Sequence, residues 1–420
     1  MHSKSGRCLA GAARPAPAEA KVLPYGRHCL SERDIAAATG VLRSDWITQG
    51  PKIAEFEEAV AAYCGARFAV AVCNGTAALH LACLAAGVKP GHVGVTSPIS
   101  FVASANCLLY CQGLPAFVDI DPRSLTLDPH QLESLLLRKA AAGSPVRVLV
   151  PVHFGGYPCD IVAIAELAGR FGCAVVEDAA HALGAEYEVS QAANSRWARV
   201  GACDHSDMAV LSFHPVKHIT TGEGGMVLTN NATLARRLRE LRTHGITRDP
   251  ARLRTNDGPW FYEMQALGFN YRITDFQCAL GLSQLQSLNR FLARRREIAA
   301  AYTTAFEELG ELILPPMDSR ARPAWHLYVV QLRLERLTAG RLEIFEALRN
   351  EGLGVNVHYI PIHLQPYYRE KFSTAPGDFP HAEAYYARAI SLPMYPAMTD
   401  GDVQHVVSTV RQVLSRFRRP

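Results

Sequence analysis

Features that would assign a function class at once are missing from this 420-residue chain. It has no uninterrupted apolar run long enough to cross a membrane, and its N-terminus has no apolar core of a secretory signal. The net charge of +4 is small for this length and gives no reason to expect nucleic acid as a partner. We therefore expect a protein that binds neither membranes nor nucleic acids.

Two further absences narrow the chemistry. The eleven cysteines include no C-x-x-C pair, so the sequence predicts neither a zinc site nor a disulfide framework. Reduced, buried thiols in a cytoplasmic protein are expected instead. A nicotinamide-dependent oxidoreductase would have G-x-G-x-x-G after its first strand, but the glycine-rich segment Gly222–Gly225 precedes a strand.

The chain does contain the alternation of short apolar runs and helical stretches that is typical of an α/β fold. Seven runs are predicted to form a mostly parallel sheet with helices on both faces. They are Phe68–Cys73, Val93–Thr96, Ala116–Ile120, Val146–Val152, Cys173–Glu177, Met208–Phe213 and Met226–Leu228.

The C-terminal part has a different pattern. Long helices are predicted over 232–243 and 275–304, followed by a smaller α+β unit with strands Leu327–Leu334 and Gly354–His358 around the helix Arg341–Asn350. The length suggests two or three domains. We expect a mobile N-terminal extension over residues 1–21, an arm over 22–50, a large domain over 51–285 that includes a surface loop at 249–264, and a small C-terminal domain over 286–420.

Lys217 lies between the apolar run Met208–Phe213 and the glycine-rich turn. Burial removes water from an amine and favours its neutral form, which is nucleophilic toward an aldehyde cofactor. Pyridoxal 5'-phosphate is therefore the first hypothesis. For an isolated lysine the alternative is a side chain that extends from the strand end to solvent.

Such a cofactor needs an anion for its ring nitrogen, donors for its phosphate and a flat partner for its ring. Asp178 ends an apolar run typical of a buried parallel strand, where a carboxylate faces the ligand crevice, unless it is a solvated acid at a loop. His181 can support the ring or Asp178, or be a satisfied core histidine.

The phosphate donors are predicted at Gly75 and Thr76, which follow a strand and begin a helix; an ordinary N-cap is the alternative. Ser212 offers a second hydroxyl. Phe101, after another strand end, is predicted to cover the ring, although a lone phenylalanine is usually core.

Four longer segments resemble the DegT/DnrJ/EryC1/StrS sugar aminotransferases, and the resemblance extends from about Val22 to the C-terminus. They are SFHPVKHITTGEGGMVLTN at 212–230, RTHGITRDP at 242–250, GFNYRITDFQCALGLSQL at 268–285 and GVNVHYIPIHLQPYY at 354–368. Within the family the chain is most similar to the UDP-4-amino-4,6-dideoxy-N-acetyl-β-L-altrosamine transaminases of pseudaminic acid biosynthesis. The implied fold is the fold-type I architecture of pyridoxal-phosphate enzymes.

The resemblance also implies a role for each matching position. Lys217 and Asp178 would be catalytic and, with Gly75, Thr76, Phe101, His181 and Ser212, would hold the cofactor. Asn270 would reach the cofactor of the neighbouring subunit, so that the active unit is a homodimer. Sugar-nucleotide contacts would come from Tyr25, Asp45, Trp46, Ile47, Thr48, Gly75, Ser212, Asn270, Val357, His358, Tyr359 and Ile360.

The implied reaction moves an amino group from L-glutamate, which leaves as 2-oxoglutarate, to C4 of UDP-4-keto-6-deoxy-N-acetyl-β-L-altrosamine. Arg242, Arg248 and Arg272 are candidates for binding the glutamate carboxylates. The segment Val189–Arg199 departs from the family pattern because it is lengthened by Gln191–Ser195.

Three alternatives remain at this point. One is a sister aminotransferase acting on another UDP- or dTDP-4-keto-6-deoxyhexose. The second is a nucleotide-sugar oxidoreductase, which the missing glycine motif disfavours. The third is a non-catalytic regulator that binds pyridoxal phosphate, but this chain retains Lys217 and has no separate basic helix-turn-helix segment.

Overall fold

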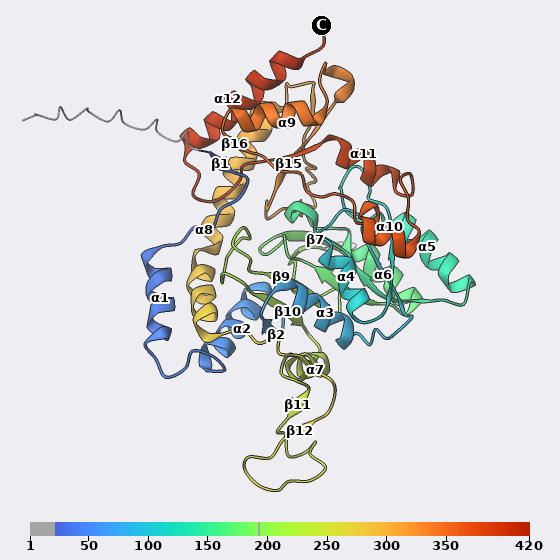
Figure 1. The fold of residues 1–420 in the computed structure, drawn as a ribbon, viewed down its shortest axis with the longest axis vertical. Helices are drawn as coiled ribbons and strands as arrows, with labels where there is room; N and C mark the ends of the chain where they lie inside the picture. Colours follow the sequence, from blue (N-terminus) through green and yellow to red (C-terminus); the bar gives the residue numbers. More distant parts are fainter. Residues whose placement is uncertain (1–21, 192–193) are drawn as a thin grey trace, which may run out of the picture.

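The computed structural model describes residues 22–191 and 194–420 (Figure 1). The predicted mobile extension, residues 1–21, lies outside the described residues. No helix in the described ranges is long and apolar enough to span a membrane.

A seven-stranded sheet forms the centre of the larger part of the molecule, with the strand order β2-β10-β9-β6-β5-β3-β4. Its strands are β2 (Phe68–Val72), β3 (Val93–Thr96), β4 (Leu114–Phe117), β5 (Val146–Val150), β6 (Ala174–Asp178), β9 (Met208–Ser212) and β10 (Gly225–Thr229). The predicted mostly parallel sheet is confirmed. Only β10 is antiparallel to its neighbours β2 and β9, because the chain returns directly from β9 through the Lys217 loop.

Both faces of this sheet are buried, because successive strand residues point to opposite sides. Val70 and Val72 pack under α3 (Gly75–Ala85), α4 (Ala103–Tyr110) and α7 (Ala232–Arg242). Ala69 and Ala71 join the core on the other face, under α2 (Pro51–Cys64), α5 (Pro129–Ala141), α6 (Ile161–Phe171) and the first half of α8 (Asp275–Phe306).

The helices begin where the local sequence supplies a cap. The side chains of Asn74, Asp128 and Asp160 accept backbone N–H bonds at the starts of α3, α5 and α6. Ser31 and Asp34 form a capping box at the start of α1 (Glu32–Leu42). These caps place the first turn of α3 directly after β2.

A smaller antiparallel sheet of β13 (Leu312–Ile313), β15 (Tyr328–Leu332) and β17 (Ala389–Leu392) forms a second core. Against it pack α9 (Arg341–Asn350), α12 (Asp400–Phe417) and the second half of α8. The whole of α8 is about 48 Å long at 1.5 Å per residue, so it reaches both cores. Two further helices, α10 (Pro366–Phe372) and α11 (Pro380–Arg388), lie beside the larger sheet (Figure 1).

The predicted strand Gly354–His358 is wrong for most of its length. Only β16 (Leu353–Gly354) is a strand, and it pairs in parallel with β1 (Leu23–Pro24) from the N-terminal arm. Asn356 accepts a bond from the backbone N–H of Val357 with its own side chain, and the chain then turns toward the larger sheet. As a result, Tyr25 and residues 356–359 reach the same cavity.

Two pairs of antiparallel strands extend from the core. β7 (Glu186–Gln191) and β8 (Asn194–Arg199) form a three-stranded sheet with β14 (Ala321–Arg322), so the described residues on either side of 192–193 are docked on the C-terminal part. β11 (Ile246–Thr247) and β12 (Glu263–Met264) enclose the predicted surface loop, which projects from the molecule below α7 (Figure 1).

Candidate active site

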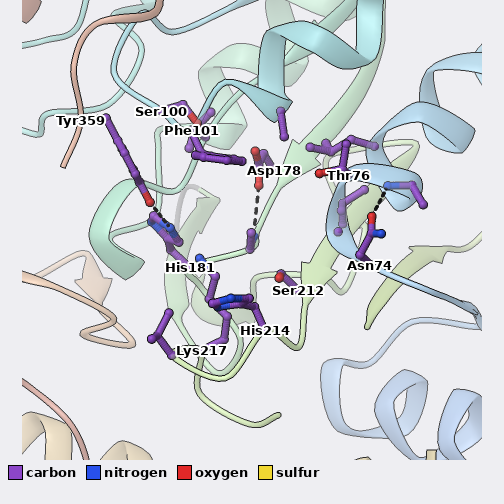
Figure 2. Close-up of a pocket in the computed structure, with 18 of the residues that line it drawn as sticks. Asn74, Thr76, Ser100, Phe101, Asp178, His181, Ser212, His214, Lys217 and Tyr359 are labelled. Atoms are coloured by element: carbon purple, nitrogen blue, oxygen red, sulfur yellow. Dashed lines mark hydrogen bonds between the residues drawn. The ribbon is translucent and has the colours of Figure 1, made fainter. Parts of the chain in front are cut away.

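A cavity of about 780 Å³ opens at the carboxyl ends of the parallel strands. Its walls come from segments that follow β2, β3, β6 and β9, and from the chain after β1 and β16. Figure 2 shows Lys217, Asp178, Thr76 and Ser212 around this common space.

Lys217 lies in the loop after β9, in a turn in which its backbone N–H donates to His214. Burial lowers the pKa of the amine to about 8, while the charge of Asp178 opposes that shift. A substantial fraction of the amine is therefore neutral near pH 8. The alternative of a lysine extending into bulk solvent does not hold.

Asp178 ends β6 and is buried. Ser104 Oγ from α4 donates to its Oδ2 at 2.6 Å, and the backbone N–H of Ala180 donates to Oδ1 at 3.2 Å. Ser100 Oγ lies 2.5 Å from Ser104 Oγ. The sequence analysis missed Ser104, although its position four residues after Ser100 on a helix start was a usable signal.

The start of α3 forms the expected cradle. Asn74 accepts from Ala77 N–H at 2.8 Å and leaves the N–H groups of Gly75 and Thr76 in the first helical turn facing the cavity. A Cβ at Gly75 would lie 3.1 Å from the Cβ of Ser212, so the absence of a side chain keeps this corner open. A helix start and hydroxyls in such an arrangement fit a phosphate group.

An aromatic wall closes the opposite side. Tyr359 and His181 have rings 24° apart, with Tyr359 Oη 3.2 Å from His181 Nε2. Phe101 lies beside Tyr359, and the residue is 57% exposed because it borders the open cavity. Tyr25 and His358, with ring centroids 5.0 Å apart, complete this side.

Six predicted residues do not line the cavity of this chain. Trp46 and Ile47 are more than half exposed, and Asn270 forms a bridge with Thr243. The predicted residues outside the lining are Asp45, Trp46, Ile47, Thr48, Asn270 and Ile360.

None of the three candidate arginines lines the cavity of the described chain. Arg242 Nη1 donates to Glu57 Oε1 at 2.6 Å, so this guanidinium already has a carboxylate partner. Arg248 lies over the ring of Tyr262 on the projecting hairpin. Arg272 borders a separate depression beside Arg242.

Sequence reasoning also missed His326, which lies on the segment before β15. Its Nε2 is 3.5 Å from Lys217 Nζ, and its ring centroid is 4.3 Å from that of His181. The residue is separated from Lys217 by more than a hundred positions, and no local pattern marks it.

The fold and the cavity together define a fold-type I enzyme with the residues that pyridoxal phosphate requires. The model of the DegT/DnrJ/EryC1/StrS aminotransferase family matches residues 28–411, so the chain belongs to that family. Its cofactor is therefore pyridoxal 5'-phosphate.

Three relatives illustrate the similarity. The spore coat polysaccharide biosynthesis protein SpsC of Bacillus subtilis is 40% identical over 393 residues, covering 93% of this chain and 97% of SpsC. Helicobacter pylori PseC, an aminotransferase involved in the biosynthesis of pseudoaminic acid, is 29% identical with a TM-score of 0.83, covering 94% of this chain and 100% of PseC. The sugar aminotransferase CalS13 from Micromonospora echinospora is 28% identical with a TM-score of 0.80, covering 93% and 99%.

Proposed function

We propose that this protein is a sugar aminotransferase that moves an amino group from L-glutamate to C4 of UDP-4-keto-6-deoxy-N-acetyl-β-L-altrosamine in pseudaminic acid biosynthesis. The observation that carries the aminotransferase activity is the convergence of Lys217, Asp178 and the start of α3 on one cavity. The choice of sugar rests on the four matching segments and on the similarity to PseC.

The residues divide the work between them. Bound pyridoxal phosphate supplies an electron-accepting ring, and Asp178 is placed to keep its nitrogen protonated. The N–H groups of Gly75 and Thr76 and the hydroxyl of Ser212 would hold its phosphate. Lys217 Nζ takes a proton from the donor's α-carbon and later delivers one to the sugar's C4, which a pKa of about 8 permits near neutral pH.

We further propose that a second copy completes the site. Asn270 and the segment 45–48 lie outside the cavity of their own chain and are exposed. The carboxylates of glutamate need cations, and Lys217 is the only lysine or arginine among the described lining residues. We propose that an arginine of the second subunit supplies the cation for the glutamate carboxylates. We also propose that the enzyme acts in the cytoplasm.

One alternative has an observation in its favour. SpsC, at 40% identity, is named for another polysaccharide, which supports a sister aminotransferase acting on a different UDP- or dTDP-4-keto sugar. Family membership and the retained Lys217 leave the oxidoreductase and the non-catalytic regulator without support.

The test offers the purified enzyme L-glutamate with the L-arabino and D-xylo 4-keto sugars in parallel. The L-arabino sugar is the proposed substrate, and we expect it to be aminated faster. Faster amination of the D-xylo sugar would reject the proposed substrate. Lys217→Ala should lower the rate by at least about 10²-fold with either sugar, whereas Lys52→Ala, at an exposed ion pair, should have no effect.

A further inference from the structure

Four buried histidines surround the Lys217 amine. They come from separate parts of the chain: His181 after β6, His218 beside the lysine, His326 before β15 and His358 after β16. The positive charge of Lys217 lowers the pKa of all four, in addition to burial, so each is neutral at physiological pH.

Three of these rings have a hydrogen-bond partner other than Lys217. His181 Nδ1 accepts from the backbone N–H of Gly155, so its Nε2–H faces Tyr359 Oη. His218 Nε2 donates to the carbonyl of Ala324. His358 Nδ1 lies 2.8 Å from Ser391 Oγ.

His326 differs from the other three. Within the described ranges, the only hydrogen-bond partner of its ring is the amine of Lys217, 3.5 Å from Nε2, and its buried Nδ1 has no partner. An unpaired buried polar atom costs free energy, and where one persists it calls for a functional explanation. The imidazole therefore has no structural hydrogen bond that would account for it.

The backbone that carries His326 is nevertheless tightly built. The buried guanidinium of Arg295 donates to the carbonyls of Trp325 at 3.1 Å and His326 at 3.3 Å, and Trp325 has a positive φ of 52°. A Cβ at Gly156 would lie 2.9 Å from the backbone nitrogen of His326, so only glycine permits this approach. These contacts fix where the imidazole points.

The groups that face His326 explain why it remains an acceptor. The rings of His181 and His218 lie 4.3 and 5.8 Å away, Lys217 lies in front and Arg295 behind. Burial comes first in lowering the pKa of His326, and the charges of Lys217 and Arg295 add to it. The ring therefore stays neutral while the lysine gains or loses its proton.

We propose that His326 is the positioning residue of Lys217. Its Nε2 accepts one N–H of the amine in both protonation states, which directs the lone pair of the neutral amine, or an N–H of the ammonium, at the substrate carbon. No proton moves to the imidazole, because Lys217 Nζ both takes the proton from the donor's α-carbon and releases it in the forward direction. The proposal rests on the proposed aminotransferase function only in the identity of that carbon.

The first test uses the apoprotein and needs neither donor nor sugar. The pH dependence of Lys217 modification by trinitrobenzenesulfonate, followed on its peptide by mass spectrometry, should have a midpoint of about 8. In His326→Gln the amide oxygen takes the place of Nε2 and should keep that midpoint. His326→Asn is one methylene shorter, loses the bond to the ammonium form, and should lower the midpoint by about one pH unit.

The second test measures the half-reaction with L-glutamate by stopped-flow absorbance. We expect His326→Asn to be about 10- to 100-fold slower than His326→Gln, with little change in donor KM. His363→Gln is the matched control, because His363 is also buried with an unpaired Nδ1 but its Nε2 pairs with Glu383 and not with Lys217. It should leave both readouts at the wild-type values.

Thermal melting of the Gln and Asn variants shows whether both are folded, and their comparison isolates the position of one atom. Equal midpoints and equal rates in the two variants would overturn the proposal. If the apoprotein midpoints separate while no 4-keto sugar is aminated, the role of His326 stands and the proposed sugar is wrong.

Discussion

At the scale of single residues, the chemistry depends on a few side chains whose ordinary properties are changed by their surroundings. Lys217 loses water and becomes a base near pH 8, while Asp178 is oriented by hydrogen bonds from Ser104 Oγ and the Ala180 N–H. Neither property belongs to the residue type. Both come from groups that the chain brings from elsewhere.

Ser104 is the residue on which the orientation of Asp178 depends. Ser104→Ala removes the 2.6 Å hydrogen bond to Asp178 Oδ2 and should slow the half-reaction with glutamate about tenfold. Ser104→Thr keeps the hydroxyl and should recover most of the rate. Ser134→Ala, on the exposed face of α5, is the control, and a rate for Ser104→Ala within twofold of wild type would contradict the assignment.

At the scale of elements, the phosphate cradle is a junction between a helix and two strands. The first turn of α3 lies against the start of β10, and a Cβ at Gly225 would be 2.4 Å from the carbonyl oxygen of Asn74. The backbone nitrogen of Gly75 would be 2.7 Å from the same Cβ. Because both contacted atoms belong to the backbone, neither can move aside without displacing the helix start.

Gly225→Ala should therefore displace the cradle. We expect a loss of about 1–3 kcal/mol of stability and at least tenfold weaker cofactor binding, measured by urea unfolding and by fluorescence titration. Gly169→Ala, in α6 with open space around its Cβ position, should instead be neutral or stabilise by up to about 1 kcal/mol. Unchanged cofactor affinity in Gly225→Ala would refute the cradle.

At the scale of the whole molecule, the site joins two hydrophobic cores and lowers the stability of the apoprotein. The folded-state pKa of Lys217, about 8, lies below its ordinary value of 10.5. The folded protein thus binds fewer protons than the unfolded chain between these values. The free energy of unfolding should therefore rise with pH between about 8 and 10.5. Below pH 8 the destabilisation caused by the protonated Lys217 amine is fully present.

Lys217→Met keeps a flexible chain but removes the amine. The apoprotein variant should be about 1–3 kcal/mol more stable than wild type at pH 7, and the difference should vanish near pH 10.5. Urea unfolding at several pH values measures this. Lys52→Met, at an exposed pair, should show no such dependence, and equal stabilities of Lys217→Met and wild type at pH 7 would contradict it.

A second whole-molecule prediction concerns the shared site. Lys217→Ala and Asn270→Ala should each lose activity, but unfolding and refolding them together should restore about a quarter of it. In a mixed dimer one site then has both residues intact, provided that Asn270 acts on the neighbour. If both residues act within one chain, mixing restores nothing.

The sequence by itself determined the strands of the larger sheet, several helices and the residues at strand ends. Short apolar runs between turn signals favour buried strands, and the carboxyl ends of parallel strands meet at one edge. Lys217, Asp178, Gly75 and Thr76 could therefore be brought together on paper before any coordinates were known.

Only the tertiary structure decided which distant groups surround that edge. His326 reaches Lys217 because Arg295 and Gly156 fix a segment from the second core, and Tyr25 arrives because β1 pairs with β16. Such contacts depend on packing between cores rather than on spacing along the chain. The same reason explains why Gly354–His358, with a strand-like pattern, instead turns toward the cavity.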